Sequence, residues 1–350
     1  MSTVIAEYIW SDGESLRSKI KIFTSNNIGH PIKNISCSDF PEWNFDGSST
    51  RQSITSDSDL FLKPVYFCKN PFFESSSEKN YYLVLNQVMN PDNSAHETNN
   101  YNKLYQLFQN NKLNTDNLLG SWFGIEQEYI ILDKNGDAYD IDYIGDKIIY
   151  NHNQHYCSVG TGKAMGRRIA EEHMNMCLDA GIKICGINSE VTQSQWEFQI
   201  GPLNAFDVSN QLWVARYILL KVAEKYNAVI SFHPKPFKQL NGSGAHTNFS
   251  TREMREKGGL EKIYEAIEKL SKTHKEHIEV YGKYNDQRLI GKNETANINT
   301  FSYGKCDRGS SIRIPINVLK DGCGYLEDRR PAANMDPYLV CERLLRTVKE

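Results

Sequence analysis

The stretch from Gly124 to Ile131, GIEQEYII, places two carboxylates, Glu126 and Glu128, inside a run that otherwise has the pattern of a buried strand. Successive strand side chains point to opposite faces, so the two glutamates share one face, roughly 6.6 Å apart. An unpaired buried carboxylate is too costly to persist, and two on one face repel each other. The pair is therefore expected to face solvent, to be protonated or to hold a cation.

A second acid occupies a similar strand-like run, QWEFQI. Trp196, Phe198 and Ile200 fall on one face of this run, and Glu197 and Gln199 fall on the other. An acid again lies inside an apolar strand, which strengthens the cation interpretation.

Three further ligand-type residues stand in apolar or Gly-rich contexts: Glu190 in INSEV, His246 in GSGAHTNF and Glu327 in GYLEDRRP. Together with the acids above they make a carboxylate-rich set with one imidazole. Such a set suits Mg²⁺ or Mn²⁺ and argues against zinc or copper. Spacing alone does not show that the six residues converge, and an isolated His is more often a satisfied core residue.

Composition restricts the class of protein. The chain has 350 residues, of which 39% are hydrophobic and 11% aromatic, enough for one large domain and one small one. A net charge of -3 gives no argument for nucleic acid or an anionic membrane as partner. No apolar run reaches membrane-spanning length, and the N-terminus lacks the pattern of an export signal. The eight cysteines form no C-x-x-C pair, so we expect reduced thiols and a cytoplasmic location.

The polar, Asn-rich segment 86–117 is the clearest boundary in the chain, and it is expected to contain a helix around 101–111. We predict a small β-rich domain over 1–90, a linker with a helix over 91–117, and a larger catalytic domain over 118–350. The predicted fold class is α+β.

Periodicity and capping signals predict three later helices. The first spans 166–180 and ends at Gly181, the second is capped by Asp207 and runs to 226, and the third spans 260–278. His274 and His277 in KTHKEHI are expected on the surface of that third helix. His152 and His155 in YNHNQHY are expected in a loop. Strands are predicted at GIEQEYIIL, QWEFQIG, AHTNFS and SIRIP.

Several motifs carry a resemblance to the glutamine synthetases of the eukaryotic type. They are PEWNFDGSST (41–50), WFGIEQEY (122–129), QWEFQIGP (195–202), NGSGAHTNFS (241–250), NETANIN (293–299), SIRIP and EDRRP. Each motif alone is weak, but they follow one another in order over nearly the whole chain.

The resemblance implies a β-grasp-like N-terminal domain and a catalytic domain in which helices flank a curved antiparallel sheet. It implies ATP-dependent ligation of ammonia to L-glutamate through γ-glutamyl phosphate. It also implies a homo-oligomer, a decamer of two pentameric rings, with active sites between subunits.

The resemblance also implies roles for individual residues. One divalent ion would be held by Glu128, Glu190 and Glu197, and a second by Glu126, His246 and Glu327. Asp46, Glu294, Arg308 and Arg329 would be catalytic, with Asp46 binding ammonium and Glu294 on a flap that closes the site. Glutamate would contact Asn241, Gly242, His246, Arg288 and Arg329, and ATP would contact Trp122, Pro202, Asn248, Ser250, Arg308, Arg313 and Tyr325.

One departure from the family pattern concerns the flap. Relatives commonly have His immediately before the flap acid, whereas this chain has Asn293. Flap ordering or glutamate affinity is therefore open to change in this chain.

Three other interpretations remain open at this stage. A glycoside hydrolase also uses two carboxylates, but it does not explain six ligand-type residues with several arginines. A non-catalytic descendant would be expected to have lost a ligand. A related ligase that joins glutamate to another amine would share the ATP and metal machinery.

Overall fold

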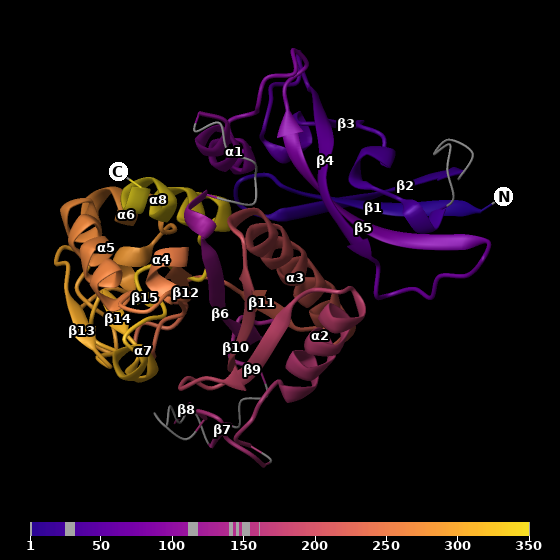
Figure 1. Cartoon of the computed structure of the whole chain (residues 1–350). Coiled ribbons are helices and arrows are strands. Elements are labelled where there is room, and N and C mark those ends of the chain that lie inside the picture. The colour runs from indigo at the N-terminus through magenta and orange to yellow at the C-terminus, as the bar shows by residue number, and fades with distance from the viewer. Residues whose placement is uncertain are drawn as a thin grey trace. The chain divides into compact units, whose positions relative to one another are not determined.

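The computed structural model describes residues 2–24, 32–110, 118–139, 143–144, 147–148, 155–160 and 162–349. These residues form two compact units (Figure 1). Unit 1 comprises Met1–Lys103, Asn175–Ile182 and Asn210–Ile218, and unit 2 comprises Leu104–Met174, Lys183–Ser209 and Leu219–Glu350. The units interleave along the chain, so the boundaries expected at 90 and 117 stay a prediction. The mixture of strands and helices confirms the α+β class.

Unit 1 is built on a five-stranded sheet with the order β2-β1-β5-β4-β3, in which β1 and β5 are parallel and the other neighbours antiparallel. Alternate residues of β1, from Val4 to Trp10, are buried and pack with Phe40 and Phe45. Glu7 and Ile9 on the opposite face are buried too, so both faces of this strand are covered. The strands are β1 (Thr3–Ser11), β2 (Leu16–Thr24), β3 (Trp43–Asp46), β4 (Asp59–Lys69) and β5 (Lys79–Met89).

Unit 2 is built on a larger sheet, in which β6 lies near the middle. The order is β13-β14-β15-β12-β6-β10-β9, with β11 also paired to β6, and only β13 and β14 run parallel. The strands are β6 (Trp122–Leu132), β9 (Ile184–Ser189), β10 (Gln195–Leu203), β11 (Val229–Ser231), β12 (Ala245–Ser250), β13 (Tyr303–Lys305), β14 (Ile312–Ile314) and β15 (Leu326–Asp328). The short strands β7 (Tyr143–Ile144) and β8 (Lys147–Ile148) pair antiparallel with each other, apart from this sheet. All four predicted strand motifs are therefore strands.

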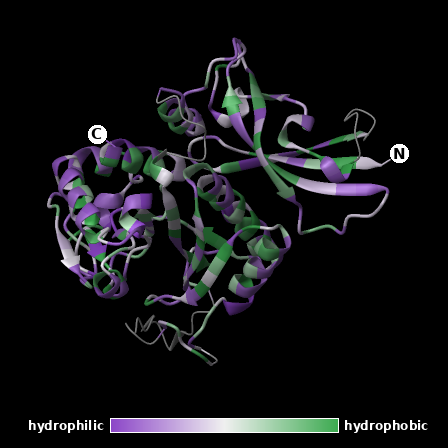
Figure 2. Cartoon of the chain, in the orientation of Figure 1, coloured by the Kyte–Doolittle hydropathy of each residue, from purple (hydrophilic) through white to green (hydrophobic). Residues whose placement is uncertain are grey.

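Helices flank the large sheet (Figure 1). The α-helices of the described residues are α1 (Asn100–Asn110), α2 (Arg167–Asp179), α3 (Ala205–Lys225), α4 (Arg252–Arg255), α5 (Leu260–Lys272), α6 (His274–Val280), α7 (Ile316–Asp321) and α8 (Pro337–Lys349). Hydrophobic and hydrophilic residues alternate along α5, whose buried residues recur every three or four positions (Figure 2). None of the helices in the described ranges is long and apolar enough to cross a membrane. The cytoplasmic location stays a prediction.

Two details of the predicted helices are wrong. Helix α3 is capped by Asn204, whose side chain accepts a hydrogen bond from the Asp207 amide at 2.9 Å, while Asp207 lies in the first turn. The region 260–278 is not one helix, because the helix is interrupted at Thr273, between α5 and α6.

Candidate metal centre and active site

Strand register brings four of the six candidate ligands together. On antiparallel strands, directly opposite residues share a face. His246 of β12 lies opposite Glu126 of β6, and Glu197 of β10 lies opposite Glu128 of β6. Because Glu126 and Glu128 are two residues apart, all four side chains lie on the same face of the sheet.

The other two ligands come from the flanks of these strands. Glu327 of β15 lies opposite Asn248, which is two residues from His246 and therefore on the same face. Glu190 follows β9, and its amide donates to the Gln195 carbonyl at 2.8 Å. The predicted convergence of the six side chains is thus an observed feature of the structure.

The ligands form two groups of three. In each group the ligand atoms lie within 4.8 Å of one another. The first group, named triad A, is Glu126, His246 and Glu327. The second group, named triad B, is Glu128, Glu190 and Glu197.

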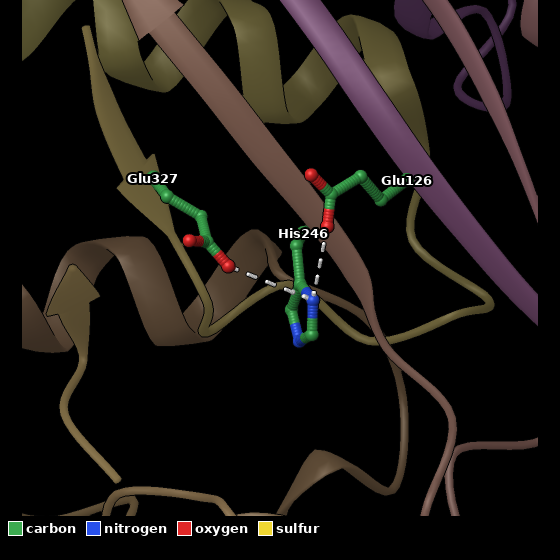
Figure 3. Close-up of side chains that lie close together, drawn as sticks. All are labelled: Glu126, His246 and Glu327. Carbon is green, nitrogen blue, oxygen red and sulfur yellow. Dashed lines mark ion pairs between the residues drawn. The ribbon is translucent and has the colours of Figure 1, made fainter. Parts of the chain in front are cut away.

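Triad A mixes acids with an imidazole. Figure 3 shows His246 between the two carboxylates, with its Nδ1 3.6 Å from Glu126 Oε2 and 3.9 Å from Glu327 Oε1. Burial and the nearby Arg329 hold the pKa of His246 well below its usual value, so the ring is neutral and can offer a lone pair. Glu327 is bound by Arg313 at 2.5 Å and by Arg329 at 2.6 Å.

Triad B consists of carboxylates alone. Burial raises the pKa of Glu128 to about 8, with Glu190 adding to the effect. Burial raises the pKa of Glu197 to about 9, with Glu126 and Glu128 contributing. Burial also raises the pKa of Glu190. Within the described ranges no lysine or arginine forms an ion pair with these three groups, so their negative charge requires protons or a bound cation.

A small cavity of about 60 Å³ lies against both triads. Other predicted site residues line it, namely Asn241, Gly242, Arg288, Glu294, Arg308 and Arg329. Arg288 is fully enclosed, and its Nη2 donates to the carbonyls of Arg329, Arg330 and Pro331 at 2.7–3.1 Å. Its guanidinium therefore has a fixed position beside the cavity.

A second cavity of about 320 Å³ is lined mostly by apolar atoms. It is lined by five of the seven residues predicted to contact ATP, which are Trp122, Pro202, Asn248, Ser250 and Tyr325. Arg255 covers the Trp122 ring at 4.0 Å from its centroid. Glu126 lines both cavities, so the apolar cavity adjoins triad A.

Comparison with known proteins identifies the family. Residues 108–279 match the family described as "Glutamine synthetase, catalytic domain". A glutamine synthetase of Candida glabrata is 49% identical over 99% of this chain and 88% of its own length. The chain belongs to the glutamine synthetase family.

Further relatives agree. A glutamine synthetase of Saccharomyces cerevisiae is 48% identical over 99% of this chain and 89% of its own length. A putative glutamine synthetase of Acanthamoeba polyphaga mimivirus is 45% identical over 100% of this chain and 95% of its own length. A solved glutamine synthetase of Plasmodium falciparum matches with a TM-score of 0.73 and 18% identity, over 99% of this chain and 71% of that one, and supports the fold.

Sequence reasoning missed the amides that hold the triads of this glutamine synthetase family member. Each triad B carboxylate accepts from one carboxamide: Glu128 from Gln195 at 3.2 Å, Glu190 from Asn188 at 2.9 Å, and Glu197 from Gln199 at 2.7 Å. In triad A, Asn248 donates to Glu126 at 2.9 Å. Gln199 shares a strand face with Glu197, so the alternation of QWEFQI already carried this signal.

Asp46 belongs to a different unit from these ligands. It ends β3 in unit 1, whereas both triads belong to unit 2. Its carboxylate is exposed and accepts hydrogen bonds from the hydroxyls of Ser48 and Ser49, both at 2.6 Å. These bonds lower the pKa of Asp46 and keep it ionised.

The expected surface location of two histidines is wrong. His277 is fully buried between Tyr281 and Thr347, and His274 is partly buried against Arg330. His155, which is expected in a loop, lies outside helices and strands; it is buried, and its Nδ1 lies 2.9 Å from the Lys163 carbonyl. His152 lies outside the described residues.

Proposed function

We propose that this member of the glutamine synthetase family catalyses the ATP-dependent ligation of ammonia to L-glutamate, giving L-glutamine through γ-glutamyl phosphate. The observation that carries the proposal is the pair of ligand triads on one sheet face, next to arginines and an apolar cavity. Transfer of a phosphoryl group between two anions needs such a concentration of positive charge.

The two triads fit divalent cations. Triad B would hold one ion and triad A a second, both Mg²⁺ or Mn²⁺, because hard cations prefer carboxylate oxygens. The raised pKa values in triad B support this fit, since a cation would replace the protons that the buried acids otherwise retain. When bound, such ions would neutralise charge on the transferring phosphoryl group and orient it.

The protein's own residues would bind and orient the substrates. Arg308, Arg313 and Arg329 would contact phosphate oxygens, and Asn241, the Gly242 backbone, His246, Arg288 and Arg329 would hold glutamate. The apolar cavity with Trp122, Pro202, Asn248, Ser250 and Tyr325 would take the nucleotide base and sugar. In this arrangement the phosphates of ATP would reach towards triad A, whose ligand Glu126 lines both cavities.

The second half-reaction needs ammonia and the exclusion of water. Asp46 would bind ammonium and Glu294 would close the site on that side. Since Asp46 is in unit 1 and the triads are in unit 2, we propose that the site is completed between subunits of a homo-oligomer, a decamer of two pentameric rings.

The reaction is tested with purified protein, ATP and Mg²⁺, by measuring phosphate and glutamine. We expect phosphate release to require glutamate, and glutamine to form when ammonium is present. Competition with other amines separates this activity from that of a related glutamate–amine ligase. ATP hydrolysis at full rate without glutamate would refute the proposal.

The shared site is tested by complementation. Asp46→Ala and Arg329→Ala are each expected to be inactive, and mixing the two by denaturation and refolding should restore part of the activity. Sites within one chain could not recover, because every chain carries one lesion. Light scattering confirms that both variants assemble. Well-assembled mixtures without recovered glutamine synthesis would exclude sites shared between subunits.

A further inference from the structure

The segment that carries Glu294 is a short hairpin. The amide of Ile298 donates to the Leu289 carbonyl at 2.8 Å, and the amide of Gly291 donates to the Ala296 carbonyl at 3.3 Å. At its tip, Asn293 and Glu294 both have positive φ, 53° and 60°. Two consecutive non-glycine residues in this region cost conformational energy, so contacts from outside have to hold the tip.

Two side chains bind carbonyls of this hairpin. Arg329 Nη2 donates to the Glu294 carbonyl at the tip, at 3.3 Å. His274 Nε2 lies 2.8 Å from the Ile298 carbonyl at the base. The arginine follows β15, whereas the histidine begins α6.

The partners of His274 fix its tautomer. Arg330 Nη1 lies 3.1 Å from His274 Nδ1, and a guanidinium can only donate. Nδ1 therefore accepts, and Nε2 carries the proton that is donated to the Ile298 carbonyl. Burial and the Arg330 charge lower the pKa of His274, which agrees with a neutral ring.

Arg330 is itself rigidly held. Its Nε and Nη2 donate to the two Asp328 oxygens at 2.8 and 2.7 Å, and both side chains are buried. The ring of Phe301, just beyond the hairpin, packs against His274 with centroids 5.8 Å apart and lies beneath Arg330. Asp328 and Arg330 flank Arg329 in the sequence. Arg329 binds Glu327 and the Glu294 carbonyl at the active site, whereas Asp328 and Arg330 form the buried pair that holds His274.

We propose that His274 is a positioning residue, which fastens the hairpin carrying Glu294 to the strand end carrying Glu327 and Arg329. It does so by accepting from Arg330 and donating to Ile298 at the same time. Its effect on turnover rests on the proposed function of Glu294, whereas its effect on the hairpin does not.

Three substitutions separate the two bonds. His274→Gln can place an amide N–H near the position of Nε2 and keep the bond to Ile298. His274→Asn can offer an acceptor near the position of Nδ1 but is too short to reach Ile298. His274→Ala loses both bonds.

The matched control is His277→Gln. His277 is on the same helix and is more deeply buried, but its nitrogens face Tyr281 and Thr347 and not the hairpin. It therefore reports loss of a buried histidine without loss of the hairpin contact.

Hydrogen–deuterium exchange of the substrate-free protein measures the hairpin directly. We expect peptides covering 289–298 to exchange about fivefold faster in the Ala and Asn variants, which is the effect of losing one hydrogen bond. The Gln variant should stay near wild type, as should the His277→Gln control in this segment. Three results would each overturn the proposal. The first is an unchanged exchange rate of the hairpin in His274→Ala, and the second is an equal increase of that rate in all three variants. The third is an increase that extends to the peptides of α8.

Turnover supplies the second measurement. The Ala and Asn variants should release more phosphate per glutamine formed, at an unchanged KM for ATP, and the Gln variant should restore the ratio. If the wild type makes no glutamine, the proposed function fails while the exchange result still judges the role of His274. Faster hairpin exchange with an unchanged phosphate-to-glutamine ratio would overturn the link to the active site.

Discussion

Triads A and B lie on the same sheet face and share β6, yet their charge balance differs. In triad A, Glu327 is paired with two arginines and the third ligand is a neutral imidazole. In triad B, three buried carboxylates have raised pKa values and receive only amide hydrogen bonds within the described residues. The protein thus pairs arginines directly with a ligand at triad A, whereas at triad B the charges of Arg288, Arg308 and Arg329 act without an ion pair and more of the positive charge is left to a bound cation.

This difference has a consequence for metal binding. A cation gains more free energy where the ligand charge is uncompensated, because each charge pair in a buried setting is only weakly screened. We therefore expect triad B to bind its ion more tightly and to depend on it for stability. Triad A should exchange its ion more readily.

The largest expected effect comes from removing a triad B ligand. Glu128→Gln should reduce turnover by about 10³-fold or more, because a metal ligand contributes several kcal/mol of charge stabilisation and each 1.4 kcal/mol is tenfold. Glu126→Gln should also cost orders of magnitude but less than Glu128→Gln. The measurement is kcat/KM at saturating Mg²⁺, and a near-normal rate in either variant would remove that residue from its triad.

The second effect is the pH dependence of stability in metal-free protein. In the folded state Glu128 and Glu197 keep protons up to pKa values of about 8 and 9, whereas unfolded carboxyls ionise near 4.3. Between these limits the folded state binds more protons, so stability falls as pH rises, by about 1.4 kcal/mol per pH unit for each proton retained. His246 contributes little in this range, because it is neutral in the folded state and mostly neutral in the unfolded state above pH 7.

Thermal unfolding between pH 7 and 8.5 in EDTA measures this slope. We expect Tm to fall with pH, the slope to lessen in Glu197→Gln, and Mn²⁺ to raise Tm most at the alkaline end. A flat profile in the metal-free wild type would mean that the triad B carboxyls are already ionised.

Local sequence patterns predict which ligands share a strand face, but the pairing of strands that are distant in the sequence decides which ligands meet. The alternation in GIEQEYII and QWEFQI indicates which residues share a strand face. No local pattern states that His246 lies opposite Glu126, because that register depends on a strand more than a hundred residues away. Grouping the ligands into two sets therefore required the family resemblance.

The wrong predictions have local causes. The sequence N-x-x-D offers two capping residues, and Asn204 is the N-cap because it accepts from the Asp207 amide three residues on. The lysines and glutamate around His274 and His277 favour an exposed helix face. The break at Thr273 starts a new helix, and both histidines find buried hydrogen-bond partners.

A smaller effect is expected from the amides that orient the carboxylates. Gln199→Leu removes the donor at 2.7 Å from Glu197 and should weaken metal binding at triad B about tenfold, in the range typical of groups behind metal ligands. Asn248→Leu is the matched variant for triad A and should weaken that site alone. Calorimetric titration with Mn²⁺ distinguishes the two sites, and equal losses at both in either variant would contradict independent triads.

The smallest expected effect is a gain in metal affinity and not a loss. Arg313 binds Glu327 from the partly exposed side, while Arg329 holds the other oxygen of the same carboxylate. Arg313→Gln should therefore leave Glu327 in position and remove a positive charge near triad A. Because Arg313 is partly exposed, water screens its charge in part, and removing it should be worth on the order of 1 kcal/mol, so Mn²⁺ should bind triad A about three- to fivefold more tightly without nucleotide. Lys272→Gln, at an exposed lysine paired with Glu268, is the control and should change neither site. Weaker binding at triad A in Arg313→Gln would show that the arginine organises the ligand more than it competes with the ion, and the contrast between the triads would then rest on geometry and not on charge.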